Sequence, residues 1–167
     1  MKDEKLLKLL RLMMKNSRLS DRELAKRMGS SQPTVTRTRA KLEADRYIRS
    51  YTVVPDFEKL GYKIMAFTFS KMASYPSRED AVEVMKQASR WVTERPNVIF
   101  ASDGQGLGGK DVVMISLHKD YDDYTDFMRT YALDWGQIVA SFENFMVSIG
   151  SKFKMKSLDL KYLADES

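Results

Sequence analysis

The spacing of capping, small and apolar residues near the start of the chain is typical of two short helices joined by a tight turn. Ser20 and Glu23 have the types and the spacing of a capping box, in which each side chain accepts from the other residue's backbone N–H. Gly29 suits the turn, because glycine adopts a positive φ without a Cβ clash. Ser31 is placed to cap the second helix, and Pro33 is tolerated in its first turn.

The apolar residues of this segment indicate how the two helices pack. Leu24, Ala25 and Met28 fall on one face of the first helix, and Val35 and Leu42 mark the buried side of the second. This pattern predicts a helix-turn-helix. In such a unit the second helix enters the major groove of DNA and contacts base edges with its N-terminal residues.

A further helix and a wing complete the predicted N-terminal domain. Residues 2–15 form an amphipathic helix that completes a three-helix core, and residues 48–54 alternate as the strand of a wing does. We therefore assign residues 1–54 to a winged helix-turn-helix DNA-binding domain and residues 55–61, with Pro55 and Gly61, to a linker. The apolar face of the first helix comprises Leu6, Leu9, Leu10 and Met13.

The charge of the chain is unevenly distributed. Residues 1–54 hold 14 Lys and Arg against 6 Asp and Glu, a net charge of +8, whereas residues 55–167 hold 14 against 17, a net charge of −3. The positive charge coincides with the helix-turn-helix, as expected of a nucleic-acid-binding domain attached to a domain with another role.

Residues 62–167 have the order strand, helix, strand, strand, helix, strand, which predicts an α+β fold with a ferredoxin-like βαββαβ domain. Residues 62–72 are apolar at successive positions, which favours a strand covered on both faces. A one-face sheet of this order has exposed strand edges, which are usually hidden by pairing with a second copy. The predicted strands are 62–72, 98–102, 112–118 and 138–149, with a further strand at 152–163; Ser77 caps the first helix, Pro96 follows it, and Tyr124, Phe127, Met128, Tyr131 and Trp135 line the second.

The chain resembles the Lrp/AsnC family of regulators from about residue 5 to residue 163. The resemblance lies in SSQPTVTRTRAKLEADRYIRSYTVV-PDFEKLGY for the recognition helix, wing and linker, and in Gly108-Gly109-Lys110-Asp111 before VVMISL. Asp120, Tyr124 and Phe127 are similar to the family's D-x-x-x-Y-x-x-F. The chain departs from the family in several places. Arg39 replaces an aliphatic core residue, Thr38 a residue that is often basic, and Arg46 the glycine that ends the recognition helix. The loop from Asp103 to Gly109 is also longer than in the family.

The resemblance implies a transcription regulator that binds double-stranded DNA, forms a homodimer through its sheet domain, often assembles further, and senses a small molecule, commonly an amino acid. Gly108, Gly109 and Asp111 are the expected effector-binding residues. For Arg39 we expect either a slightly rotated helix or a packed stem with the guanidinium in solvent.

Helical periodicity selects the candidate DNA contacts. With Val35 and Leu42 buried, the opposite face of the helix carries Pro33, Arg37, Ala40 and Ala44. Gln32, Thr34 and Arg37 are the candidates for base edges, since Gln pairs with adenine and Arg with guanine. Thr36 is a candidate for either a base or a phosphate. The candidates for phosphate contacts are Ser31, Lys41, Arg46 and Arg49.

Three other patterns do not predict a cofactor or metal site. Residues 104–109 contain G-x-G-x-x-G, but a strand follows where dinucleotide binding needs a helix. The acidic run from Asp120 to Asp126 lacks the glycine and glutamate of a calcium loop and suits a helix N-terminus. His118 is the one histidine and there is no cysteine, which disfavours a zinc site. We expect no cofactor, no metal and no catalytic residue.

The sequence also bounds the function classes. The absence of cysteine suits a reducing cytoplasm, and no apolar run reaches the roughly 18 residues of a membrane span. We expect a cytoplasmic regulator that is not an enzyme. Two alternatives remain: an enzyme like the siroheme decarboxylases, which resemble the same scaffold but carry a His-, Asn- and Arg-bearing strand unlike VIFASDGQGLGG, and an architectural protein of low sequence specificity.

Overall fold

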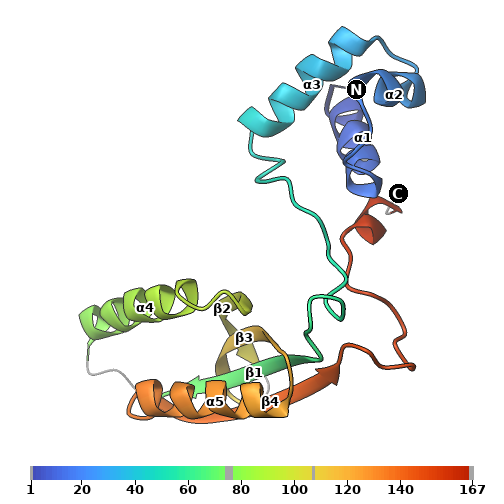
Figure 1. Ribbon diagram of the computed structural model, residues 1–167. Helices are drawn as coiled ribbons and strands as arrows, with labels where there is room; N and C mark the ends of the chain where they lie inside the picture. Colours follow the sequence, from blue (N-terminus) through green and yellow to red (C-terminus); the bar gives the residue numbers. More distant parts are fainter. Residues whose placement is uncertain (1, 74–76, 107, 166–167) are drawn as a thin grey trace. The chain divides into compact units, whose positions relative to one another are not determined.

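The computed structural model describes residues 2–73, 77–106 and 108–165, which form two compact units (Figure 1). The head comprises the residues up to Val54 together with those from Met155 onward, and the sheet domain is Pro55–Lys154. The sequence-based division placed all residues after 61 in the sheet domain. The C-terminal residues instead group with the head, because a short 3-10 helix, η1 (Lys161–Asp165), contacts its first helix.

The head contains three helices, α1 (Lys2–Lys15), α2 (Asp21–Met28) and α3 (Gln32–Ala44). The predicted capping box is confirmed: the Ser20 hydroxyl accepts from the Glu23 N–H, and the Glu23 carboxylate accepts from the Ser20 N–H at 2.8 Å. Gly29 ends α2 in the left-handed region at φ 62°. The core consists of Leu6, Leu9, Met13, Leu19, Leu24, Ala25, Val35 and Leu42, all buried.

Two of the predicted strands, at residues 48–54 and 152–163, do not form in the described part of the chain. Residues 48–54 have no regular secondary structure and are largely exposed, and they pair with no strand among the described residues. The segment from 152 to 163 holds turns and the start of η1 in place of a strand. Its alternation of Lys152, Phe153, Lys154 and Met155 imitates a strand, yet alternation produces a strand only where a neighbouring backbone supplies hydrogen bonds.

The sheet domain has the predicted βαββαβ order, with four antiparallel strands arranged β2-β3-β1-β4. The strands extend further into the glycine-rich connection than predicted. The elements are β1 (Ile64–Met72), α4 (Arg78–Thr93), β2 (Val98–Gly106), β3 (Lys110–His118), α5 (Tyr121–Trp135) and β4 (Val139–Ser148).

Only one face of this sheet is covered by the helices. Thr68 and Ser70 of β1 contact Met128 and Tyr131 of α5, so this face carries the helices and the core. Successive side chains of a strand point to opposite faces. The other side of β1, with Met65, Phe67 and Phe69, therefore faces away from α4 and α5, and the prediction that β1 is covered on both faces fails within one chain.

The face opposite the helices, which we call the open face, is apolar. Strand register places Phe100 of β2, Ile115 of β3, Phe67 of β1 and Phe145 of β4 in one row across all four strands. Phe100 is 50% exposed and Phe145 is 65% exposed. Soluble monomers rarely expose a contiguous apolar patch of this kind.

The patterns that suggested cofactors have structural roles here. Residues 104–109 connect the antiparallel strands β2 and β3, so no helix N-terminus follows them. Asp120 caps α5 by accepting from the Asp123 N–H at 2.9 Å. His118 is buried, with Nε2 2.8 Å from the Ser116 hydroxyl, and burial lowers its pKa. None of the helices described is long and apolar enough to cross a membrane.

Candidate nucleic-acid interface

The exposed side of α3 is the candidate interface. Val35 and Leu42 are fully buried, and the residues predicted opposite them are all exposed. The helix therefore presents to solvent the side that the sequence assigned to DNA. That exposed side comprises Pro33, Arg37, Ala40 and Ala44.

The three base-edge candidates lie in the first two turns of α3. Gln32 is exposed, and its side chain makes no hydrogen bond with the described residues. The Arg37 Nε donates to the Pro33 carbonyl at 3.3 Å, and its guanidinium forms no ion pair within the described part of the chain. Thr34 is half-buried, with its hydroxyl 2.8 Å from that of Ser31. Gln32 and Arg37 thus keep donors that can reach a base.

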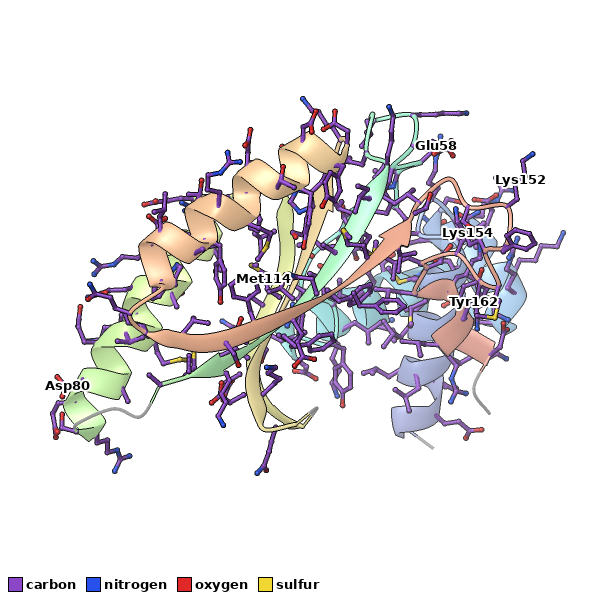
Figure 2. All side chains as sticks on the ribbon, turned by 90° about the horizontal axis from the view of Figure 1, so that it is seen from below. Glu58, Asp80, Met114, Lys152, Lys154 and Tyr162 are labelled. Atoms are coloured by element: carbon purple, nitrogen blue, oxygen red, sulfur yellow. The ribbon has the colours of Figure 1, made fainter. Side chains whose placement is uncertain are left out.

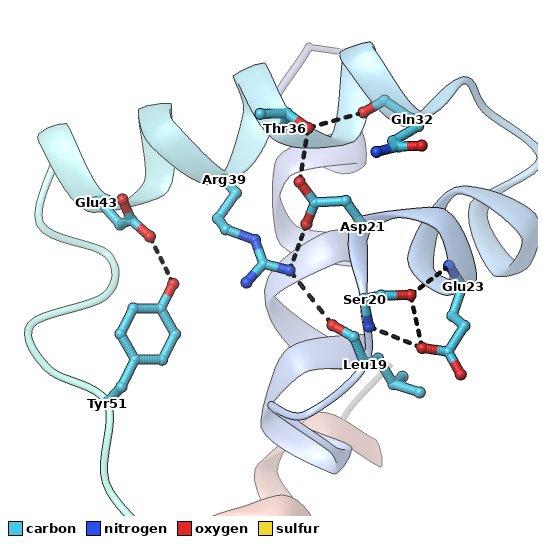
Figure 3. Close-up of polar contacts among 9 residues, drawn as sticks. All are labelled: Leu19, Ser20, Asp21, Glu23, Gln32, Thr36, Arg39, Glu43 and Tyr51. Atoms are coloured by element: carbon cyan, nitrogen blue, oxygen red, sulfur yellow. Dashed lines mark hydrogen bonds and ion pairs between the residues drawn. The ribbon is translucent and has the colours of Figure 1, made fainter.

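Thr36 is positioned differently from its neighbours, because it links α3 to α2 (Figure 3). Its hydroxyl lies 2.6 Å from an oxygen of the Asp21 carboxylate, the first residue of α2, and 3.1 Å from the Gln32 carbonyl. The other Asp21 oxygen accepts from the Arg39 guanidinium at 2.5 Å. Because the Thr36 proton is engaged inside the protein, only the lone pairs of its oxygen remain for DNA.

Arg39, which stands where the family has an aliphatic core residue, forms an ion pair with Asp21. The arginine is about three-quarters buried, and it also donates to the Leu19 carbonyl at 3.5 Å. The guanidinium therefore does not extend freely into solvent, contrary to one of the two expectations. We name the set of Asp21, Thr36 and Arg39 the α2–α3 brace, because it joins the supporting helix to the recognition helix.

The phosphate candidates surround the two ends of α3. Ser31 occupies the N-cap position, but its hydroxyl bonds to Thr34 and makes no bond to a backbone N–H. Lys41 lies 3.8 Å from Asp45 in an exposed pair, which holds it weakly. Arg46 and Arg49 are exposed, and neither forms an ion pair within the residues described. Arg46 adopts φ 58°, the left-handed conformation that a glycine would take more easily.

Comparison with known sequences relates the head to DNA-binding regulators. Residues 2–49 match the family described as winged helix-turn-helix DNA-binding. The HTH-type transcriptional regulator PH0061 of Pyrococcus horikoshii is 38% identical over 127 residues, which cover 75% of this chain and 78% of that protein. The regulator PYRAB00690 of Pyrococcus abyssi is 32% identical over 116 residues, covering 68% and 71%.

Solved structures extend the likeness to nearly the whole chain. An AsnC family transcriptional regulator from Agrobacterium tumefaciens has a TM-score of 0.74 at 25% identity, covering 95% of this chain and 97% of that one. The chain belongs to the Lrp/AsnC family of transcriptional regulators. The regulator NMB0573 of Neisseria meningitidis, solved as a complex with L-Met, shares the fold, with a TM-score of 0.76 at 20% identity and the same coverage.

The three residues that the Lrp/AsnC resemblance implies for an effector lie at one end of the sheet. Gly108 and Gly109 follow β2 with φ 68° and 81°, values that favour glycine. Asp111 on β3 accepts from the Met72 N–H of β1 at 2.9 Å, so one carboxylate oxygen ties two strands together. These geometries leave the effector role of all three residues as a prediction.

Sequence reasoning missed two contacts of this Lrp/AsnC head. Asp21 was assigned no role, although an acid at the start of α2 opposite an unusual Arg39 is a signal for an ion pair. The Tyr51 hydroxyl donates to Glu43 at 2.6 Å, which holds the segment after α3 against that helix. Burial and the Glu43 carboxylate raise the pKa of Tyr51 above its ordinary value.

Proposed function

We propose that this regulator binds an operator as a homodimer. In this proposal Gln32, Thr34 and Arg37 contact base edges. The residues that contact the phosphate backbone around them are Ser31, Thr36, Lys41, Arg46 and Arg49. The observation that carries the proposal is the exposed face of α3, where Arg37 has donors free of any ion pair within the described residues. Arginine can bind guanine through two parallel hydrogen bonds, which is the commonest specific contact in the major groove. The proposal assigns no catalytic residue to the chain.

The open face of the sheet supports the dimer. Its row of Phe100, Ile115, Phe67 and Phe145 gives a flat apolar surface that an identical copy can cover by twofold symmetry. A dimer also supplies what operator recognition needs. Two heads related by a twofold axis contact two half-sites in successive major grooves, so the preferred DNA should be palindromic.

An amino acid is the effector class that the relatives support. NMB0573 was solved with L-Met. In this proposal Gly108, Gly109 and Asp111, the residues that the family resemblance implies, contact the effector. Titration of L-methionine into the protein–operator complex tests this part of the proposal separately. A change in operator affinity that Asp111→Asn abolishes would support it. No change with methionine or any other amino acid would remove the effector from the proposal and leave DNA recognition intact.

The main experiment selects binding sequences from fragmented genomic DNA and compares the best sequence with scrambled DNA across a salt series. We expect a palindromic sequence preferred by roughly 10³-fold or more. Salt-sensitive binding without preference would instead indicate an architectural protein, since phosphate contacts alone explain such binding. Absence of binding to any DNA would overturn the proposal.

Two variants of α3 distinguish base contacts from phosphate contacts. We expect Arg37→Ala to weaken operator binding by about 1–3 kcal/mol while non-specific binding falls much less. Lys41→Ala is the matched control, because it removes one positive charge from the same helix. It should weaken both kinds of binding equally and reduce the salt dependence by about one ion. Equal losses on both DNAs for Arg37→Ala would remove it from the base contacts.

A further inference from the structure

The sheet domain contains a cavity of about 270 Å³ between α4, α5 and the sheet. Met85 and Trp91 of α4, Asp103 of β2, Met114 of β3 and Trp135 of α5 all line it. Figure 2 marks Met114 within this domain and Asp80 at the start of α4. An apolar cavity of roughly 150 Å³ is enough to bind benzene, so this one has room for a somewhat larger molecule. Gly108, Gly109 and Asp111 are not among its lining residues.

The helix that forms one wall of the cavity packs against the core only through partly buried residues. No residue of α4 is fully buried, and Met85 on the cavity wall is 46% exposed. By contrast α5 buries Tyr124, Met128, Tyr131 and Trp135. Protein interiors normally pack to the density of organic crystals. An occupant in the cavity would supply the packing contacts that the inner side of α4 lacks.

The wall also holds a hydrogen-bond donor without an acceptor. Trp135 is only 6% exposed, and its Nε1 has no partner among the described residues. The neighbouring Trp91, which packs against it edge to face at 6.2 Å, donates its own Nε1 to Asp134 at 2.6 Å. A buried N–H without a partner is destabilising. An acceptor on a bound molecule would satisfy the Trp135 N–H.

Charge and ring chemistry narrow the class of ligand. Asp103 on the cavity wall forms no ion pair with any described residue, which disfavours an anionic ligand. The ring centroid of Trp91 lies 5.6 Å from that of Tyr131 and 6.2 Å from that of Trp135, and both pairs are edge to face. Aromatic rings in this arrangement pack well against a further aromatic ring. Met72, Met85 and Met114 provide polarisable, adaptable surface on the same walls.

We propose that this cavity is a binding site for a compact aromatic molecule that carries one hydrogen-bond acceptor and no negative charge. The acceptor engages the Trp135 N–H, and the ring lies between α4 and the sheet. This site is independent of DNA recognition by the head, and its occupancy can be measured without DNA.

The test uses benzyl alcohol as the probe and the indole N–H signals of the full chain in an NMR titration. The chain has only two tryptophans, and both line the cavity, so both reporters lie at the site. Trp91→Phe assigns the two signals. We expect a saturable shift of the Trp135 signal with a Kd on the order of 1 mM or tighter. Benzoate should bind roughly tenfold more weakly than benzyl alcohol.

Ala88→Leu should abolish binding, because it replaces a methyl group on the cavity wall with an isobutyl group. Ala132→Leu is the matched control, since it makes the same change at an exposed position of α5 that does not line the cavity. Trp135→Phe, followed on the Trp91 indole signal, should weaken the binding of benzyl alcohol about tenfold more than the binding of toluene, because toluene has no acceptor. This pair of probes tests the proposal even if Ala88→Leu does not fold.

Three results would overturn the proposal. The first is no saturable shift with benzyl alcohol in the wild-type chain, and the second is equal binding to the Ala88→Leu and Ala132→Leu variants. The third is dissociation of the assembled protein by the probe in step with binding, which would assign the cavity to a second copy of the chain. Since DNA is absent from every arm, a failure here is distinct from a failure of operator binding.

Discussion

The head and the sheet domain bury their apolar residues in different ways. In the head, three helices enclose a core in which Leu9, Leu24, Val35 and Leu42 are completely buried within one chain. In the sheet domain, the helices cover one face of the sheet and leave Phe100 and Phe145 exposed on the other. The head is therefore complete as a single copy, whereas the sheet domain presents a surface that still needs a partner.

This difference matches the two tasks of a regulator of this family. DNA recognition requires a few side chains held rigidly on a helix, and a closed core under α3 provides that rigidity. In the proposed homodimer, the exposed apolar face of the sheet would supply the driving force for the assembly that spaces two heads along DNA. One chain therefore combines a head whose core is closed with a sheet domain whose open face is still uncovered.

The largest expected effect comes from placing a charge on the open face. Phe145→Asp should weaken self-association by at least about 10³-fold, because twofold symmetry places two carboxylates in one apolar contact. The fold of one chain should be largely kept, since Phe145 is 65% exposed there. Sedimentation equilibrium measures the association, and operator affinity should fall with it as the two heads separate.

Leu133→Asp is the control for that experiment. Leu133 is 80% exposed on α5, outside the open face, so the same chemical change should leave the assembly intact. An unchanged dimer in Phe145→Asp would move the interface to another surface. It would also remove the contrast between a complete head and an incomplete sheet domain.

The head could be predicted closely because its signals are local. The Ser20–Glu23 capping box, the left-handed Gly29 and the buried pair Val35 and Leu42 each depend on residues a few positions apart. The three helices accordingly have their expected positions. The α2–α3 brace was missed because it joins residues 15 and 18 positions apart, and periodicity within one helix carries no information about a contact between helices.

The sequence pattern predicted the strands less well than it predicted the helices of the head. Residues 62–72 and 152–163 both have apolar residues at strand-like positions, yet only the first became a strand, because β3 and β4 are available on its two sides. The open face likewise could not be located from sequence. Residues such as Phe67 and Phe145 indicate burial, but the pattern does not distinguish burial in a core from burial against a second copy.

A smaller effect is expected from breaking the α2–α3 brace in the head. Asp21→Ala should lower the free energy of unfolding of the head by about 2 kcal/mol, because it leaves the partly buried Arg39 without its carboxylate and removes the nearer of the two acceptors of the Thr36 hydroxyl. Chemical denaturation measures this loss. Self-association through the open face should not change, which separates the two domains experimentally.

Arg39→Leu serves as the control for the brace. It restores the aliphatic type that the family pattern has at this position, and replacing a buried charge by an apolar group of similar volume is often neutral or stabilising. In the Arg39→Leu background, Asp21→Ala should cost clearly less than in the wild type. Equal costs in both backgrounds would show that Asp21 acts through its contact with Thr36 or its charge in the first turn of α2, and not through the ion pair with Arg39.

The smallest expected effect concerns Arg46, where stability and DNA binding oppose each other. Its φ of 58° costs roughly 1 kcal/mol relative to glycine. Arg46→Gly should therefore stabilise the head by about that amount. It should also weaken DNA binding a few-fold and make the salt dependence shallower by about one ion, if the guanidinium contacts a phosphate.

Arg46→Ala separates these two contributions, because it removes the same charge but keeps a Cβ in the left-handed conformation. We expect it to match Arg46→Gly in DNA binding and to show none of the gain in stability. The difference in stability between the two variants thus gives the cost of the left-handed conformation at residue 46. Their shared loss of affinity gives the contribution of the positive charge to DNA binding. If Arg46→Gly gained stability without losing affinity, Arg46 would lie outside the interface, and the phosphate contacts near the end of α3 would rest on Lys41 and Arg49.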